Sequence, residues 1–306
     1  MSPAFWIVLA GALAAASCAL VGTFLVLRRM SMLGDAISHA VLPGIAVAFL
    51  LTGSRAPLPM LIGAGAVGVL TALLVEGLHR GGRLQQDAAI GVTFTALFAV
   101  GVILVTAFAG QIDLDQECVL YGELAYVPWD TWTLADGRSL GPRAVWILGA
   151  TLAANAAWIA LAWKELTVCA FDPELAASLG IPVGAFHLAL MAATSVTTVT
   201  AFESVGAILV VAMLVGPAAS AYLWTERLSR MALLAVAFGV ASAVLGWRLA
   251  AALDASIAGA MSVVVGAIFF VSILASPNHG VVARAVRRRR LAARRGTALS
   301  GGPAAS

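Results

Sequence analysis

The sequence predicts an all-α membrane protein, a polytopic bundle of about eight or nine transmembrane helices. Of its 306 residues, 61% are hydrophobic and only 11% are charged, whereas a soluble domain has about 25% charged residues. A helical span needs about 20 largely apolar residues, and the chain divides into runs of about that length joined by short polar stretches. Most of the chain therefore lies in the bilayer, and no separate soluble domain fits between the spans.

Each span is predicted from one apolar run. In chain order, the runs are 5–27, 33–53, 58–78, 88–109, 143–163, 184–201, 204–224, 231–250 and 257–275. The first run lacks the basic start of a signal peptide and continues well past Cys18, so it is expected to be a retained span. The sixth and seventh runs are short, and a re-entrant turn at "TAFESVG" between them is the alternative that leaves eight spans.

Two polar stretches interrupt this pattern. The longer one, 110–143, is rich in carboxylates and is expected to be an outer loop. An acidic outer surface can attract cations or face a partner protein, and a solvated loop with interfacial aromatic residues is an equally open interpretation. The shorter stretch, 164–184, predicts a short inner helix over about 172–180, because Asp172 is a suitable N-cap and Gly180 a suitable stop.

The basic residues predict the orientation. Fourteen of the 18 Lys and Arg residues fall in one alternating set of joints, which begins at Arg28 and Arg29 and ends with the tail. Because cytoplasmic joints are enriched in Lys and Arg, the N-terminus is expected outside and the C-terminus in the cytoplasm. The run "RAVRRRRLAARR" is expected to rest on anionic lipid and not to bind nucleic acid. We therefore divide the chain into a transmembrane domain, 1–276, and a disordered basic tail, 277–306.

Several enzyme motifs are excluded by their context. A P-loop needs a Gly-Lys pair, and the only lysine, Lys164, follows a tryptophan. "GAGAVG" (63–68) and "GRSLG" (137–141) match a dinucleotide and a nucleophile pattern, but no strand precedes either of them. The chain is expected not to be an enzyme, and any ATP hydrolysis that drives it must occur on another subunit.

Asp35 and His39 are the most unusual residues of the sequence. In "RRMSMLGDAISHAVLPG" they stand four residues apart, hence on one helical face, and a helix from Arg29 would place them about 9 and 15 Å along its axis. Ionisable groups at such depth are costly, and they line a pathway or find a partner. A carboxylate with an imidazole suits manganese, zinc or ferrous iron. A transient cation site, a proton relay and simple packing all remain open interpretations.

Glu203, in "TAFESVG", is the other carboxylate that we single out in apolar sequence. Its predicted place at the outer membrane edge favours a role at an entrance or gate over a share in the Asp35 and His39 site. His79, His187 and His279 are expected to be ordinary residues at the inner interface.

Four segments resemble the permease subunits of bacterial ABC importers for manganese, zinc and iron. They are "RRMSMLGDAISHAVLPGIAVAFLLTG", "QQDAAIGVTFTALFAVGV", "FDPELAASLGI" and "FESVGAILVVAMLVGPAASA", in the family's order. The resemblance extends to about residue 276 and implies the metal-type ABC importer permease fold in a bacterial inner membrane. It implies no permanently bound cofactor, because the divalent metal ion is the transported substrate.

The resemblance also implies partners and site residues. The partners are an ABC ATPase, an extracytoplasmic metal-binding protein, and a second permease that is either identical or homologous. Asp35 and His39 match the family's metal-contacting positions, whereas Ser31 stands where related permeases offer an amide, which leaves the third ligand open. "FDPELAASLG" would be the coupling helix that docks on the ATPase. Its coupling residues are Asp172, Glu174, Ala176, Ala177 and Gly180.

The expected function is therefore ATP-driven import of a divalent transition metal. "DLDQECVLYGELAYVPWD" looks most like the manganese and iron branch of the family, and zinc is the close alternative. A stand-alone proton-coupled metal carrier, with Asp35 and His39 as its relay, is the second hypothesis. An intramembrane metalloenzyme is disfavoured because the sequence has no HExxH motif.

Overall fold

The structure is a computed structural model that describes residues 2–53, 57–82, 84–108, 124–133, 139–277 and 280. Over these residues it is a helical bundle, in which nine helices are long and apolar enough to cross a membrane. The prediction of an all-α bundle is confirmed. The eight-span alternative is not supported, because residues 200–205 of "TAFESVG" continue one span, 183–205, and the next span follows directly at 207–224.

Eight of the spans are single helices. They are α1 (Pro3–Leu27), α4 (Pro57–Gly82), α5 (Gln86–Phe108), α7 (Arg143–Leu161), α10 (Val183–Val205), α11 (Ala207–Trp224), α12 (Leu228–Leu253) and α13 (Ile257–Ala275). The α10 and α11 helices almost abut, since Gly206 alone separates them with φ = 81°. Glycine tolerates such a backbone angle without steric cost, so one residue suffices for the turn.

The second span is broken in two. Helix α2 (Leu33–Ala40) and helix α3 (Leu42–Thr52) meet at Val41. Pro43, in the first turn of α3, has no backbone N–H, and therefore it cannot donate to the carbonyl four residues earlier, that of His39. The break thus falls two residues after His39, which the sequence analysis singled out.

Helix α1 is packed on several sides, against α7, α10, α11 and α12. Its buried surface is rich in small residues such as Ala10, Ala14 and Ala15, which let membrane helices approach closely. A buried polar contact adds to this packing, because the Asn155 amide of α7 donates to Ser17 Oγ of α1 (3.1 Å) and to Thr197 Oγ1 of α10 (2.6 Å).

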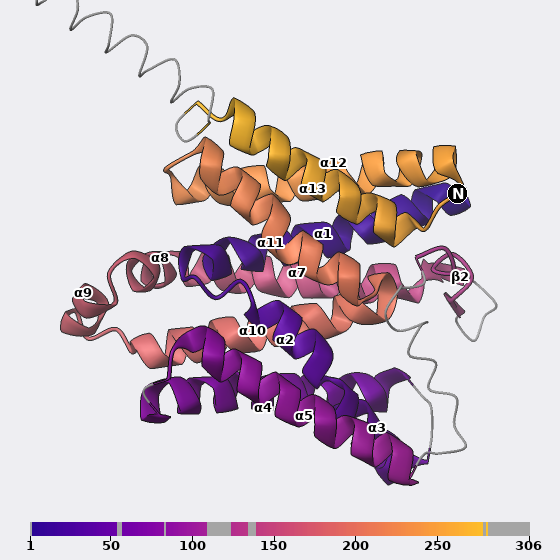
Figure 1. Cartoon of the computed structure of the whole chain (residues 1–306). Coiled ribbons are helices and arrows are strands. Elements are labelled where there is room, and N and C mark those ends of the chain that lie inside the picture. Colours follow the sequence, from indigo (N-terminus) through magenta and orange to yellow (C-terminus); the bar gives the residue numbers. More distant parts are fainter. Residues whose placement is uncertain are drawn as a thin grey trace, which may run out of the picture.

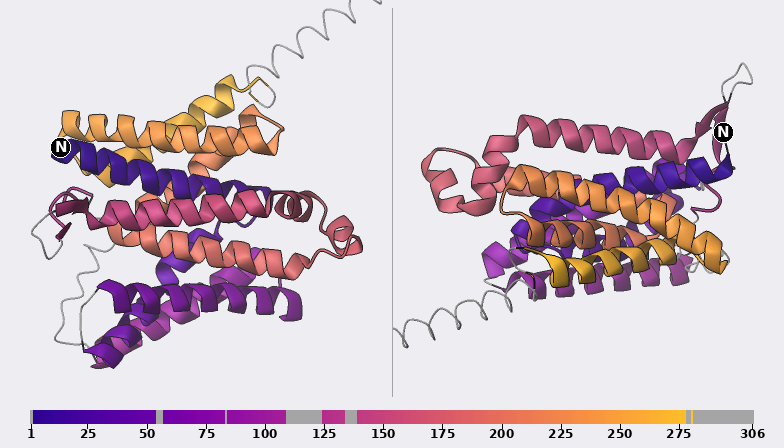
Figure 2. Two further views of the ribbon diagram at one scale, coloured as in Figure 1. Left: turned by 180° about the vertical axis from the view of Figure 1, so that it is seen from behind. Right: turned by 90° about the horizontal axis from the view of Figure 1, so that it is seen from above.

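Helix α2 lies inside the bundle, in contact with α10 and α11 on one side and with α4 and α5 on the other (Figure 1). Figure 1 and the rear view in Figure 2 place α8 (Trp163–Phe171) and α9 (Pro173–Ser178) at the end of the bundle opposite to the N-terminus. We call this the α9 end. The other end contains a short antiparallel hairpin, β1 (Thr131–Thr133) and β2 (Ser139–Pro142), which the sequence analysis did not predict.

The structure contains a short helix within the predicted range 172–180, namely α9. Asp172 Oδ1 accepts a hydrogen bond from the Leu175 N–H (2.9 Å), and Gly180 follows the helix with φ = 79°. Two other predicted regions lie largely outside the described residues. They are the basic tail, 277–306, of which the structure describes 277 and 280, and the outer loop, 110–143, of which it does not describe 110–123 and 134–138.

Candidate functional site

Asp35 and His39 lie next to each other on α2, with 3.5 Å between Asp35 Oδ1 and His39 Nε2. The expectation that one helical face brings them together is confirmed. The helix begins at Leu33, not at Arg29, so His39 is six residues from its start, about 9 Å of helical rise. The helix starts later because a turn over residues 28–32 connects it to α1.

The surroundings of the pair are mostly apolar. The His39 ring packs on two aromatic rings of α5, with centroids 5.9 Å from Phe94 and 6.3 Å from Phe98. Asp35 lines an open groove between α2, α11 and α13 together with Ser31, which lies in the turn before α2 and not on its helical face. Apart from these two residues, the groove is lined by Met32, Val211, Ala212, Val215, Gly216, Ala219, Ser262, Val265, Gly266 and Phe269.

The pair is only half covered. The side chain of Asp35 is 36% exposed and that of His39 is 42% exposed, although the helix belongs to a membrane span. In the part of the chain that the structure describes, no group of three or more His, Cys, Asp and Glu side chains could hold a metal ion. Asp35 and His39 therefore form a polar pair on a partly exposed face of α2.

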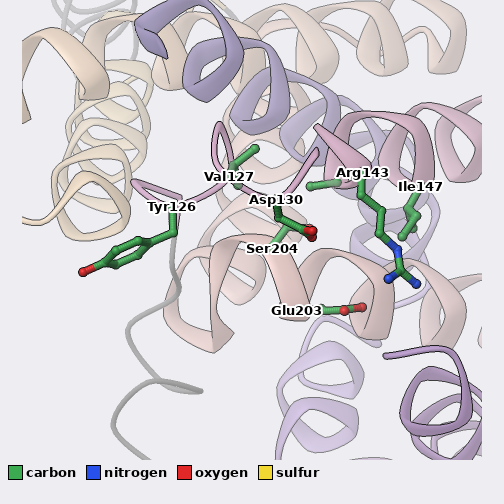
Figure 3. A pocket seen from close by; sticks show the side chains of 8 residues that line it. Tyr126, Val127, Asp130, Arg143, Ile147, Glu203 and Ser204 are labelled. Carbon is green, nitrogen blue, oxygen red and sulfur yellow. The ribbon is translucent and has the colours of Figure 1, made fainter. Parts of the chain in front are cut away.

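Glu203 lies elsewhere, in the last turn of α10. It lines a pocket at the N-terminal end of the bundle together with Asp130 and Arg143 (Figure 3). The Arg143 N–H donates to the Asp130 carbonyl (2.9 Å), which fixes the loop before β1 to the start of α7. The pocket thus combines two carboxylates with one guanidinium and lies apart from the groove that Asp35 lines, as expected for Glu203.

The segment predicted to be the coupling helix turns most of its side chains outward. Glu174, Ala177 and Gly180 are exposed, and they stand among exposed apolar side chains, those of Phe171, Leu175 and Leu179. Ala176 differs from the other predicted coupling residues because it is fully buried. Its methyl group therefore anchors α9 to the rest of the bundle and is not part of the outward surface.

Comparison with known proteins assigns the chain to a protein family. Residues 2–276 match the ABC 3 transport family. The chain belongs to this family. It is thus a multi-pass permease subunit of an ABC transporter in a cell membrane and not an enzyme, and ATP is hydrolysed on a separate subunit. Family membership does not favour the alternative of a stand-alone carrier.

Three relatives illustrate how far the similarity of this ABC 3 permease extends. It is 49% identical over 287 residues to the manganese transport system membrane protein MntD of Bacillus subtilis, a match that covers 94% of this chain and 97% of the relative. It is 40% identical to the zinc transport system membrane protein TroD of Treponema pallidum, over 93% of this chain and 77% of the relative. In the structure of PsaBC from Streptococcus pneumoniae in complex with Fab, one chain superposes with a TM-score of 0.76 at 30% identity, covering 94% of this chain and 96% of that one.

One polar cluster of the ABC 3 permease was missed by the sequence analysis. His187 was expected to be an ordinary interfacial residue, but its side chain is only 14% exposed. Its Nε2 lies 2.7 Å from Glu76 Oε2 and its Nδ1 lies 2.9 Å from Arg28 Nη1. The available signal was Glu76 itself, a carboxylate within the apolar run of α4, which needs a partner at that position.

Proposed function

We propose that this permease forms the import path for a divalent transition metal and that Asp35 and His39 bind the metal transiently. The observation that carries the proposal is the contact between a carboxylate and an imidazole, 3.5 Å apart, on the half-exposed face of a membrane span. Carboxylate and imidazole are ligands that manganese, zinc and ferrous iron accept.

The exposed face of α2 also supports the proposal that a partner protein covers it. Charged or strongly polar side chains that face lipid are costly, and Asp35 lines a groove whose other walls are nearly all apolar. A second permease, identical or homologous, would cover this face and contribute its own pair of ligands. The complete site would then lie between two permeases, with four protein ligands in place of two.

Manganese is our first choice of metal and zinc the second. The names of the relatives support this order, because MntD belongs to a manganese transport system at 49% identity and TroD to a zinc transport system at 40%. Iron is supported by the chemistry of the ligands alone.

The remaining parts of the permease fit a path that runs from outside to inside. The pocket of Glu203 would be the outer gate, where an extracytoplasmic binding protein delivers the metal. The α9 helix, with Asp172, Glu174 and Ala177, would dock on the ATPase in the cytoplasm. This orientation agrees with the excess of basic residues in the joints at the α9 end.

The test is cellular metal accumulation in a strain that depends on this permease. Asp35→Ala combined with His39→Ala is expected to abolish accumulation of the transported metal at normal expression. Ser262→Ala is the matched control, because Ser262 lines the same groove and donates to a carbonyl of its own helix (Ala258, 2.9 Å). Unchanged accumulation of manganese, zinc and iron in the double variant would contradict the proposed site.

A further inference from the structure

A chain of polar contacts crosses the α9 end of the bundle and joins four helices. The Arg28 guanidinium, at the end of α1, lies within hydrogen-bonding distance of two groups, His187 Nδ1 of α10 (2.9 Å) and the Cys169 carbonyl of α8 (3.1 Å). His187 Nε2 in turn reaches Glu76 of α4 (2.7 Å). We call these three side chains, Arg28, His187 and Glu76, the Arg28 relay.

The chemistry of arginine sets the direction of every bond in the relay. A guanidinium can only donate, so His187 Nδ1 must accept from Arg28 and carries no proton. The imidazole is then neutral, with its proton on Nε2, and this N–H donates to the Glu76 carboxylate. The relay therefore runs from a cation through a neutral imidazole to an anion, and all three side chains are partly buried.

The position of the relay is as important as its chemistry. Arg28 is the first residue of the turn that leads into α2, the helix of Asp35 and His39. Cys169 lies three residues before Asp172, the N-cap of α9. One guanidinium thus bridges the segment that ends at the coupling helix and the segment that begins the metal-binding helix, while His187 and Glu76 hold it against α10 and α4.

We propose that the Arg28 relay couples movement of the ATPase-docking segment to the metal-binding helix. This inference rests on the proposed function, because it assigns α2 to the metal and α9 to the ATPase. When the ATPase shifts α9, the Cys169 carbonyl moves with α8 and pulls on Arg28, which displaces the start of α2. Arg28 and His187 are positioning residues in this account, since neither is expected to contact the metal.

A metal site is the other use that His187 and Glu76 suggest, and the structure disfavours it. The imidazole nitrogen that faces Glu76, Nε2, donates its hydrogen to that carboxylate and so has no free lone pair for a metal, and Arg28 adds a fixed positive charge at the other nitrogen, Nδ1. In addition, within the described ranges no third His, Cys, Asp or Glu side chain joins these two in a group that could hold a metal ion.

The test measures the accessibility of Cys169, which needs no metal. Cys169 is 3% exposed, and Cys118→Ser with Cys18→Ala leaves it as the only thiol of the chain. The complex with its ATPase is placed in lipid nanodiscs and treated with a maleimide, at rest and during ATP hydrolysis. The wild-type relay is expected to keep labelling slow at rest and to allow it to rise during turnover.

Variants of the relay separate its hydrogen bonds from simple packing. His187→Leu and Arg28→Gln are expected to raise the resting rate about ten-fold, because each breaks a hydrogen bond to a charged group. His187→Gln has an amide oxygen that can accept from Arg28 and an amide N–H that can donate to Glu76, so it should label like the wild type. Arg230→Gln, which removes an exposed basic residue at the same end, is the control for charge.

Coupling itself is measured in proteoliposomes as manganese transported per ATP hydrolysed. This ratio should fall about ten-fold in His187→Leu and stay normal in His187→Gln. Equal labelling and equal ratios in the two variants would overturn the relay. If Arg28→Gln or His187→Leu does not reach the membrane, Arg28→Lys is tested in its place, because a single ammonium cannot reproduce the two-pronged donor geometry of the guanidinium. Normal labelling and a normal transport ratio in Arg28→Lys would also overturn the relay. Failure of the proposed metal site would be seen separately, as normal transport by the Asp35 and His39 variants.

Discussion

Gly101 of α5 allows close packing of α5 against the break in the second span, and replacing it by alanine should disturb the metal-binding helix from a distance. A Cβ atom at Gly101 would lie 2.7 Å from Pro43 Cδ, 2.8 Å from the Pro43 nitrogen and 3.1 Å from Leu42 Cβ. Ordinary contact begins at 3.4 Å, so Pro43 would have to recede by at least 0.7 Å, the difference between 3.4 and 2.7 Å. His39 lies four residues before this proline, and its ring packs on Phe94 and Phe98 of α5 itself.

The expected cost follows from overpacking a close contact. Adding a methyl group where neither backbone can yield costs about 1–3 kcal/mol, and each kcal/mol lowers the melting temperature by roughly 2–4 °C. Gly101→Ala should therefore melt about 2–12 °C below the wild type. Because the displaced Pro43 lies four residues after His39 and both contact α5, metal uptake should fall as well.

The control lies in the same helix. A Cβ atom added at Gly91 of α5 would meet no neighbouring atom within 4 Å, and Gly91→Ala should match or slightly exceed the wild-type melting temperature because alanine is the better helix former. The assay is thermal unfolding of the two purified variants in one detergent, followed by uptake in proteoliposomes. Identical melting and uptake in the Gly101 and Gly91 variants would refute the reasoning about this contact.

Three further predictions concern other parts of the permease. Asp172→Ala removes the cap of α9, which costs about 1 kcal/mol, and should weaken co-purification of the ATPase. Asp172→Asn keeps a hydrogen-bond acceptor and should not weaken it. Equal co-purification of the two variants would show that the cap has no part in docking. Asn155→Leu removes the hydrogen bonds to Ser17 and Thr197. It should lower the stability in detergent by about 1–3 kcal/mol, because one hydrogen bond between membrane helices contributes up to about 1.7 kcal/mol. An unchanged melting temperature would show that the contact contributes nothing. Burial raises the pKa of the Cys169 thiol, so the reactive thiolate is scarcer at a given pH. Alkylation of Cys169 should therefore be slower than that of free cysteine at about pH 8 and should still increase above about pH 9. Equal pH profiles of alkylation for Cys169 and free cysteine would contradict this.

Much of the fold could be predicted because lipid imposes a simple rule on sequence. A span must be a long apolar run, and the predicted runs correspond to the helical spans of the structure with shifts of a few residues at their ends. The same rule explains why the break at Val41 was not predicted. A proline four residues after His39 removes one backbone hydrogen bond, yet the apolar run continues through it, so the run predicts one span and does not show that it consists of two helices.

The site was predicted unevenly. The pairing of Asp35 with His39 followed from helical periodicity alone, and the cap of α9 followed from the Asp172 and Pro173 sequence. The Arg28 relay did not follow, because its contacts join residues that are 111 and 159 positions apart in sequence. Contacts of that range depend on how the helices pack, and periodicity within one helix contains no information about the neighbour that a side chain meets.

The central claim is that Asp35 and His39 bind the metal during transport. The most direct measurement is manganese uptake by proteoliposomes that contain the permease and its ATPase, with ATP hydrolysis recorded in the same samples. Asp35→Asn combined with His39→Gln should lower uptake about 100-fold or more, as expected from two lost charged or coordinating groups of about 1.5–3 kcal/mol each, while ATP hydrolysis continues. Uptake at the wild-type rate in this double variant would contradict the account.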